Sequence, residues 1–107
     1  VVVLAGDGGF QFTMEELGAA VHHRIPVTVV IFNDGTHTAV KAAQKRTYPG
    51  RYVAVDLVNP DYVKLAEAYG IEGVRANSPQ ELTAALERAK SSEMPVIIDV
   101  PINLESY

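Results

Sequence analysis

The sequence predicts an α/β fold in which an open parallel sheet has helices on both faces. Short continuous apolar runs, such as those at residues 1–5, 27–32 and 96–100, are typical of strands that are buried on both faces of a parallel sheet. Stretches with apolar residues at helical spacing alternate with these runs, so helices would connect successive strands. With 107 residues, of which 48% are apolar, we expect one domain with its own core.

The first strand is expected at residues 1–5 and leads directly into a glycine-rich segment, residues 6–9, that favours a tight loop. A helix is expected at residues 13–23, since apolar residues recur there at helical spacing. Thr13 and Glu16 have the spacing of a capping box. In this motif each of the two side chains accepts a hydrogen bond from the backbone N–H of the other residue. This segment therefore predicts strand, loop and helix in that order.

The second strand, at residues 27–32, is expected to stop at the Asn-Asp-Gly turn of residues 33–35. The stretch that follows is the least regular part of the sequence. It predicts a short helix at residues 39–45 and a turn at residues 49–50, where proline precedes glycine.

Two further helices carry start signals. Asn59 followed by Pro60 favours a helix that begins there and ends at Gly70. Ser78 followed by Pro79 repeats the same pattern before the next apolar stripe. Each of these helices would cover part of the sheet.

Two strands complete the predicted sheet. A short strand is expected at residues 73–76 and a buried one at residues 96–100, directly after a proline. Residues 101–107 are expected to form a tail.

Charge and hydropathy exclude several classes of partner. The net charge is −4, and the basic residues form only one loose group within residues 41–51, which argues against a nucleic-acid partner. The apolar runs are far shorter than the ~20 residues of a membrane-spanning helix, so we expect no membrane partner. The chain has no cysteine, which excludes disulfides and thiolate metal sites.

Two acidic loops carry the chemistry that the residues suggest. Residues 6–9 and 33–36 follow consecutive parallel strands, and ligands of open α/β sheets bind beyond the carboxyl ends of the strands. Asp7 among glycines would repel a phosphate unless a cation lay between them. Three interpretations stay open: a Mg²⁺-bridged diphosphate site that uses Asp7 and Asp34, a dinucleotide site, for which Gln11 stands where a glycine is expected, or two acidic turns without a ligand.

The spacing of these loops resembles a known family. Gly6-Asp7-Gly8, Pro26, an apolar strand and Asn33-Asp34 resemble the motif of thiamine-diphosphate enzymes. Residues 51–70 and the ending PVIIDVPI are similar to the C-terminal domain of the acetolactate synthase, benzoylformate decarboxylase and pyruvate oxidase group. The resemblance implies a thiamine-diphosphate-binding fold, with residues 1–107 as a C-terminal domain for thiamine diphosphate and Mg²⁺. On this reading the chain is a fragment, a partial domain whose N-terminal part is missing.

The resemblance also implies a set of site residues. Three of them, Asp7, Asp34 and the carbonyl of Thr36, would bind Mg²⁺. Asp34 departs from the family, which usually has asparagine there. His37 would lie near the thiazolium and the substrate, although an exposed loop histidine is the plainer alternative. The complete set expected at the cofactor is Gly6, Asp7, Gly8, Gly9, Asp34, Thr36 and His37.

The activity implied by the resemblance is that of a decarboxylase, carboligase or lyase acting on 2-oxo acids or related carbonyl substrates, thus a lyase or transferase. In this family the catalytic glutamate comes from the pyrimidine-binding domain of the same or a neighbouring subunit, so no catalytic residue is assigned to this chain. Glu16 is explained by helix capping. We expect a cytoplasmic homo-oligomer, and the alternative is a non-catalytic binding or assembly module of the same fold. Residues 38–40 read Thr-Ala-Val, where acetolactate synthases often have Gly-Met-Val, so no substrate is assigned.

Overall fold

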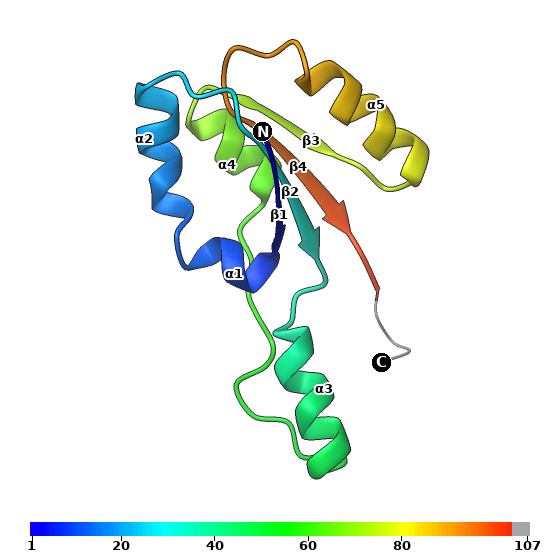
Figure 1. Cartoon of the computed structure of the whole chain (residues 1–107). Helices are drawn as coiled ribbons and strands as arrows, with labels where there is room; N and C mark the ends of the chain where they lie inside the picture. The colour runs from blue at the N-terminus through cyan, green and yellow to red at the C-terminus, as the bar shows by residue number, and fades with distance from the viewer. Residues whose placement is uncertain (104–107) are drawn as a thin grey trace.

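Within residues 1–103, the sheet has four parallel strands, as the sequence predicts. A computed structural model describes residues 1–103 and orders the strands β1-β2-β4-β3 (Figure 1). The two central strands, β2 and β4, are the longest, and the expected tail falls partly on residues 104–107, outside the described residues. The strand bounds are β1 (Val2–Gly6), β2 (Thr28–Asn33), β3 (Glu72–Arg75) and β4 (Val96–Pro101).

Helices cover both faces of this sheet (Figure 1). One face carries α1 (Asp7–Gln11), the 3₁₀ turn η1 (Met14–Glu16), α2 (Leu17–His22) and α4 (Tyr62–Ala68). The other face carries α5 (Pro79–Ala89), and α3 (Thr38–Thr47) projects away from the sheet. None of the helices within residues 1–103 is long and apolar enough to cross a membrane.

The alternation of side chains along β2 and β4 explains why both faces need helices. Ile31 and Ile97 point into the cluster beneath α1, α2 and α4, and both are fully buried. Val30 and Ile98 point into the opposite cluster beneath α5 and are at most 1% exposed. Successive residues of a strand face opposite sides, so a strand that is apolar throughout must be covered twice.

Strand β1 is less buried than its sequence predicts. Its residues Val2, Val3 and Leu4 are 54%, 41% and 69% exposed. β1 pairs only with β2, and no described element covers its outer edge. The apolar run therefore predicts the strand correctly. The burial of the strand, however, depends on which elements lie beside it, and the run does not specify them.

The segment after β1 differs from its prediction in two ways. Residues 7–11 form the short helix α1 instead of a loop, because Phe10 is buried and packs edge-to-face on Tyr62 with ring centroids 5.5 Å apart. Thr13 does not cap the next helix through its side chain. The N–H of Glu16 donates to the backbone carbonyl of Thr13 at 3.0 Å, so the expected capping box is absent and a 3₁₀ turn forms in its place.

The predicted start of α4 is also wrong, by two residues. Asp61, and not Asn59, caps α4 by accepting hydrogen bonds from the N–H groups of Val63 and Lys64. Ser78 caps α5 as expected, with its hydroxyl accepting from the N–H of Glu81. The side chain of Asn59 is thus left available for other contacts.

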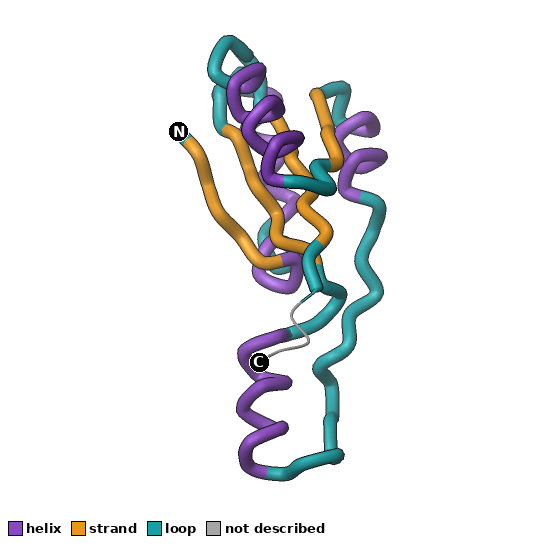
Figure 2. The backbone as a smooth tube through the Cα atoms, turned by 90° about the vertical axis from the view of Figure 1, so that its right-hand side faces the viewer, coloured by secondary structure: helices purple, strands orange, loops and turns teal. Residues whose placement is uncertain are grey.

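The segment between β2 and α4 forms a projecting arm, defined here as residues 36–58. It contains α3, which is longer than predicted, and a return loop that runs back beside it to α4 (Figure 2). The outgoing and returning segments of the arm are hydrogen-bonded to each other near its base, where the N–H of His37 donates to the carbonyl of Val55 at 2.7 Å. Farther out, the Gln44 side chain bonds the N–H and the carbonyl of Val53. The arm accounts for the elongated shape, 47 × 29 × 21 Å.

Candidate functional site

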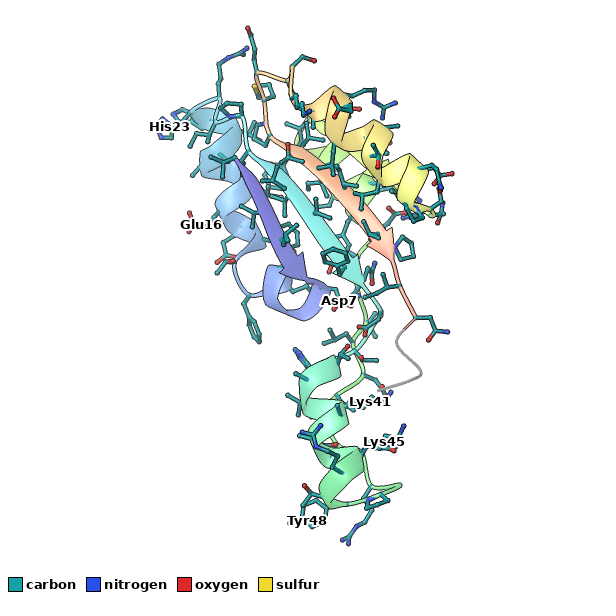
Figure 3. The ribbon with its side chains drawn as sticks, turned by 45° about the vertical axis from the view of Figure 1, so that its right-hand side comes forward. Asp7, Glu16, His23, Lys41, Lys45 and Tyr48 are labelled. Carbon is teal, nitrogen blue, oxygen red and sulfur yellow. The ribbon has the colours of Figure 1, made fainter. Side chains whose placement is uncertain are left out.

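A cavity of about 330 Å³ lies where β1 and β2 end and the arm begins. Figure 3 shows Asp7 at this end of the sheet, above α3, whereas Glu16 lies on the outer side of the molecule. The structure brings together on this cavity all seven residues expected at the cofactor, whose roles stay predictions. They are Gly6, Asp7, Gly8, Gly9, Asp34, Thr36 and His37.

Asp7 is a buried carboxylate, only 2% exposed. Its Oδ1 accepts a hydrogen bond from the N–H of Gly8 at 2.9 Å. Its Oδ2 accepts two, from the N–H of Gly35 at 2.8 Å and from Nδ2 of Asn59 at 2.7 Å. Burying a charged group is costly unless donors surround it, and these three donors fix the carboxylate at the cavity wall.

Asp34 is held by its own turn, directly before the arm. Its Oδ1 accepts from the N–H of Thr36 at 3.0 Å, and its Oδ2 accepts from the hydroxyl of Thr38. This is the local side-chain-to-backbone contact that aspartate commonly makes in turns. The acidic turn that the sequence suggests is therefore real, and it presents its carboxylate to the same cavity as Asp7.

The glycines of the first loop differ in the space around them. A Cβ atom at Gly8 would lie 2.6 Å from the imidazole of His37, whereas at Gly6 and Gly9 it would meet nothing within 4 Å. The His37 ring also stacks on Phe12, with centroids 6.2 Å apart and planes 16° apart. His37 therefore packs against the glycine loop, while Gly6 and Gly9 leave open space in front of the backbone.

A chain of polar side chains runs behind Asp7. Asn59 Nδ2 donates to Asp7 and also to Asn33 Oδ1, at 2.8 Å. Asn33 Nδ2 donates to Asp99 Oδ1 at 3.0 Å, and Asp99 accepts at Oδ2 from Arg75 Nε at 3.1 Å. The site is thus connected to the middle of the sheet through side chains that are not among those lining the cavity.

Sequence reasoning missed this chain. The sequence predicts that Asn59 caps a helix, yet two residues with capping side chains, Asn59 and Asp61, stand before α4. A helix needs only one such cap. The presence of two candidates is therefore a signal that one of them, here Asn59, has a different partner. The sequence also gave no reason to place Phe32 and Ile102 at the cavity.

Three side chains near the site have shifted acidities. Burial raises the pKa of the Tyr62 hydroxyl, which donates to the carbonyl of Asp7 at 3.4 Å. The hydrogen bond to Asp99 raises the pKa of Arg75. The backbone N–H of Lys64, with help from Arg75, lowers the pKa of Asp61. These groups therefore keep their ordinary charge states near neutral pH.

Within residues 1–103, no group of three or more His, Cys, Asp or Glu side chains could hold a metal ion. Among the described residues, the cavity offers only Asp7 and Asp34 as carboxylates. A cation at this place would need further oxygens from the backbone and from a ligand.

Comparisons with known proteins agree with this geometry. Residues 1–100 match the family model "Thiamine pyrophosphate enzyme, C-terminal TPP binding domain". Acetolactate synthase from Bacillus subtilis (strain 168) is 43% identical over 103 residues, which cover 96% of this chain and 18% of that protein. The mitochondrial acetolactate synthase catalytic subunit of Saccharomyces cerevisiae is 36% identical over 103 residues, 96% of this chain and 15% of that protein.

A solved structure agrees as well. The thiamine diphosphate-dependent 4-hydroxybenzoylformate decarboxylase of Rhodococcus jostii RHA1 superposes with a TM-score of 0.91 at 31% identity, over 100% of this chain and 20% of that one. The chain thus spans about a fifth or less of the length of these relatives. It belongs to the thiamine pyrophosphate enzyme family and corresponds to the C-terminal TPP binding domain of those enzymes.

Proposed function

We propose that this domain anchors the diphosphate of thiamine diphosphate through Mg²⁺, as part of an enzyme acting on 2-oxo acids or related carbonyl substrates. The observation that carries the proposal is the position of Asp7, a buried carboxylate beside open glycine backbone at the carboxyl ends of the strands. An anionic ligand at this place needs a cation between itself and Asp7.

The oxygen atoms at the cavity suit Mg²⁺. This ion prefers hard oxygen ligands in octahedral geometry and keeps part of its shell for phosphate or water. Asp7, Asp34 and the carbonyl of Thr36 would supply three protein oxygens, and the diphosphate would supply others. The lack of a larger acidic cluster in residues 1–103 fits a site that a phosphate ligand helps to complete.

The backbone at Gly6 and Gly9 would receive the diphosphate. Both positions face open space that a side chain would otherwise occupy. The N–H groups of Gly8 and Gly35 already donate to Asp7, so in this arrangement they position the carboxylate. Because the N–H of Gly8 is used in this way, the N–H of Gly9 is the better candidate donor to the diphosphate.

The complete enzyme would need more than this chain. The cofactor supplies the carbanion chemistry when it is bound, and the protein orients it and excludes water. We infer that the catalytic glutamate comes from a pyrimidine-binding domain of the same or a neighbouring subunit in a homo-oligomer. The printed names of the relatives, acetolactate synthases and a 4-hydroxybenzoylformate decarboxylase, support a carboligase or decarboxylase, hence a transferase or lyase.

Calorimetry with thiamine diphosphate on the complete protein tests the anchoring role. Binding should require Mg²⁺ and should be lost in chelator. Asp7→Ala should abolish binding even with Mg²⁺ present, because it removes a metal ligand and leaves the donors of Gly35 and Asn59 without an acceptor.

Glu93→Ala is the matched control. It also removes one carboxylate, but Glu93 is exposed, pairs with Arg24 and precedes β4 at the opposite end of the strand. It should bind the cofactor like the unmodified protein. Equal cofactor affinity with and without Mg²⁺ would contradict the proposed site.

A further inference from the structure

We propose that Asn59 is a positioning residue for the metal site: it holds Asp7 so that only Oδ1 of this carboxylate faces the cation. The inference rests on the proposed function, because it assigns Asn59 a role toward the same ion. It goes beyond that function, because Asn59 does not line the cavity and would act entirely through Asp7.

The hydrogen bonds to Asp7 distinguish its two oxygens. A carboxylate oxygen has about two lone pairs that can accept. Oδ2 uses both, for the N–H of Gly35 and for Asn59 Nδ2, whereas Oδ1 accepts only from the N–H of Gly8. One acceptor position therefore remains on Oδ1 and none on Oδ2, so Asp7 can offer a cation one oxygen only.

Asn59 is itself fixed on both sides of its amide. Its Nδ2 donates to two acceptors, Asp7 at 2.7 Å and Asn33 at 2.8 Å, which uses both of its hydrogens. Its Oδ1 accepts from Nε2 of Gln11, at the end of α1. These partners come from two elements, α1 and β2, so the amide can turn only if several hydrogen bonds break together.

Asn33 continues the support into the sheet. It lies at the end of β2 and donates to Asp99 in β4. Asp99 is only 2% exposed and is paired with Arg75 at the end of β3. Three of the four strands thus contribute to holding Asn59, whereas the cavity side of Asp7 remains free for a ligand.

A single available oxygen affects which cation the site prefers. Mg²⁺ accepts carboxylates through one oxygen in a strict octahedron, whereas Ca²⁺ takes six to eight oxygens and often both of one carboxylate. By occupying Oδ2, Asn59 should favour Mg²⁺ over Ca²⁺. Loss of its donor would free Oδ2 and weaken that preference.

The test measures metal affinity directly. The dissociation constants of Mg²⁺ and of Ca²⁺ are determined by calorimetry on the complete protein with saturating thiamine diphosphate. Asn59→Ala and the nearly isosteric Asn59→Leu should both weaken Mg²⁺ binding by about ten- to a hundredfold, the usual effect of removing a partner behind a metal ligand. Both should weaken Ca²⁺ binding less, so that the preference for Mg²⁺ falls.

Asn77→Ala is the matched control, because Asn77 is an exposed asparagine in the turn before α5 and the chemical change is the same. It should leave both constants unchanged. The unfolding temperature without metal is measured for every variant. A lower unfolding temperature in the Asn59 variants with unchanged Mg²⁺ and Ca²⁺ constants would make Asn59 merely structural and overturn the proposal.

A second variant covers the case in which both Asn59 substitutions fail to fold. Gln11→Ala removes the donor to Asn59 Oδ1 and should weaken Mg²⁺ binding by roughly two- to tenfold, the range for one ordinary hydrogen bond. No change in this variant would then count against the proposal. Metal-independent cofactor binding in the unmodified protein would instead refute the proposed function itself.

Discussion

The central strands and the arm are built in opposite ways. In β2 and β4, residues such as Ile31, Ile97 and Ile98 are fully buried between two layers of helices. In the arm, α3 has no buried residue, and apolar side chains such as Val53 and Val58 are 73% and 96% exposed. The sheet is held by buried apolar area, whereas the arm has one buried side chain, Val55 near its base, and is otherwise held by hydrogen bonds and by the ion pair of Lys41 with Asp56.

This difference explains where the site lies. Asp7 belongs to the layered part, because it lies in α1. Its carboxylate accepts from Gly8 in α1, from Gly35 just after β2 and from Asn59 just before α4. Thr36 and His37 belong to the base of the arm, and Asp34 lies just before it, where the chain leaves the sheet. The cavity is therefore formed by one wall from the packed layers and one wall from the base of the arm.

The largest effect should come from the centre of the sheet. Ile97→Ala deletes a fully buried side chain and should lower stability by about 2–5 kcal/mol. Val58→Ala in the arm should change it by no more than about 0.5 kcal/mol, since the side chain is almost fully exposed. Native-state hydrogen exchange of the β2 amides in the complete protein measures both. A comparable loss for Val58→Ala would mean that another part of the protein packs on the arm.

A smaller effect is expected where α4 crosses β3. A Cβ atom at Gly73 would lie 2.7 Å from Ala66 Cβ and 3.0 Å from the Val63 backbone, so Gly73→Ala should cost about 1–3 kcal/mol through overpacking. The control is Gly18→Ala in α2, where the nearest atom would be the Tyr69 ring at 3.8 Å. That change should be neutral or stabilise by up to about 1 kcal/mol, because alanine favours a helix. Thermal unfolding of both variants would show whether the sign differs as expected.

The smallest effect concerns Asp34, at the junction of the two regions. Asp34→Asn keeps an oxygen for the N–H of Thr36, so the turn should persist. It removes one negative charge beside the proposed diphosphate, and cofactor affinity should rise by about fivefold, the effect of one unit charge a few ångströms away in water. Calorimetry with thiamine diphosphate and Mg²⁺ measures this. A large loss of both metal and cofactor binding would mean that the carboxylate is required.

Elements that depend on local chemistry could be predicted from the sequence. The apolar runs located β1, β2 and β4, and the Ser78-Pro79 pair located the start of α5, because continuous apolar character and a capping side chain act within a few residues. The two acidic loops could be placed side by side because parallel strands end at one edge of the sheet, whereas the full set of seven cavity residues followed from the family resemblance.

Features that depend on distant contacts could not be predicted. Two glycines in residues 7–11 disfavour a helix, yet α1 forms because Phe10 packs on Tyr62, far along the chain. The same holds for Asn59, whose partners Asp7 and Asn33 lie in other segments. The exposure of β1 likewise depends on which elements lie beside it, and an apolar run does not specify them.

The contact between Gly8 and His37 links the amino-acid choices at two positions in different loops. A methyl group at position 8 would overlap the imidazole, so an alanine there is compatible only with a smaller or displaced side chain at position 37. The amino acids tolerated at position 8 therefore depend on the side chain at position 37, and the reverse. A library that aims to alter the cavity should randomise them together, because changing position 8 alone would mostly sample clashes.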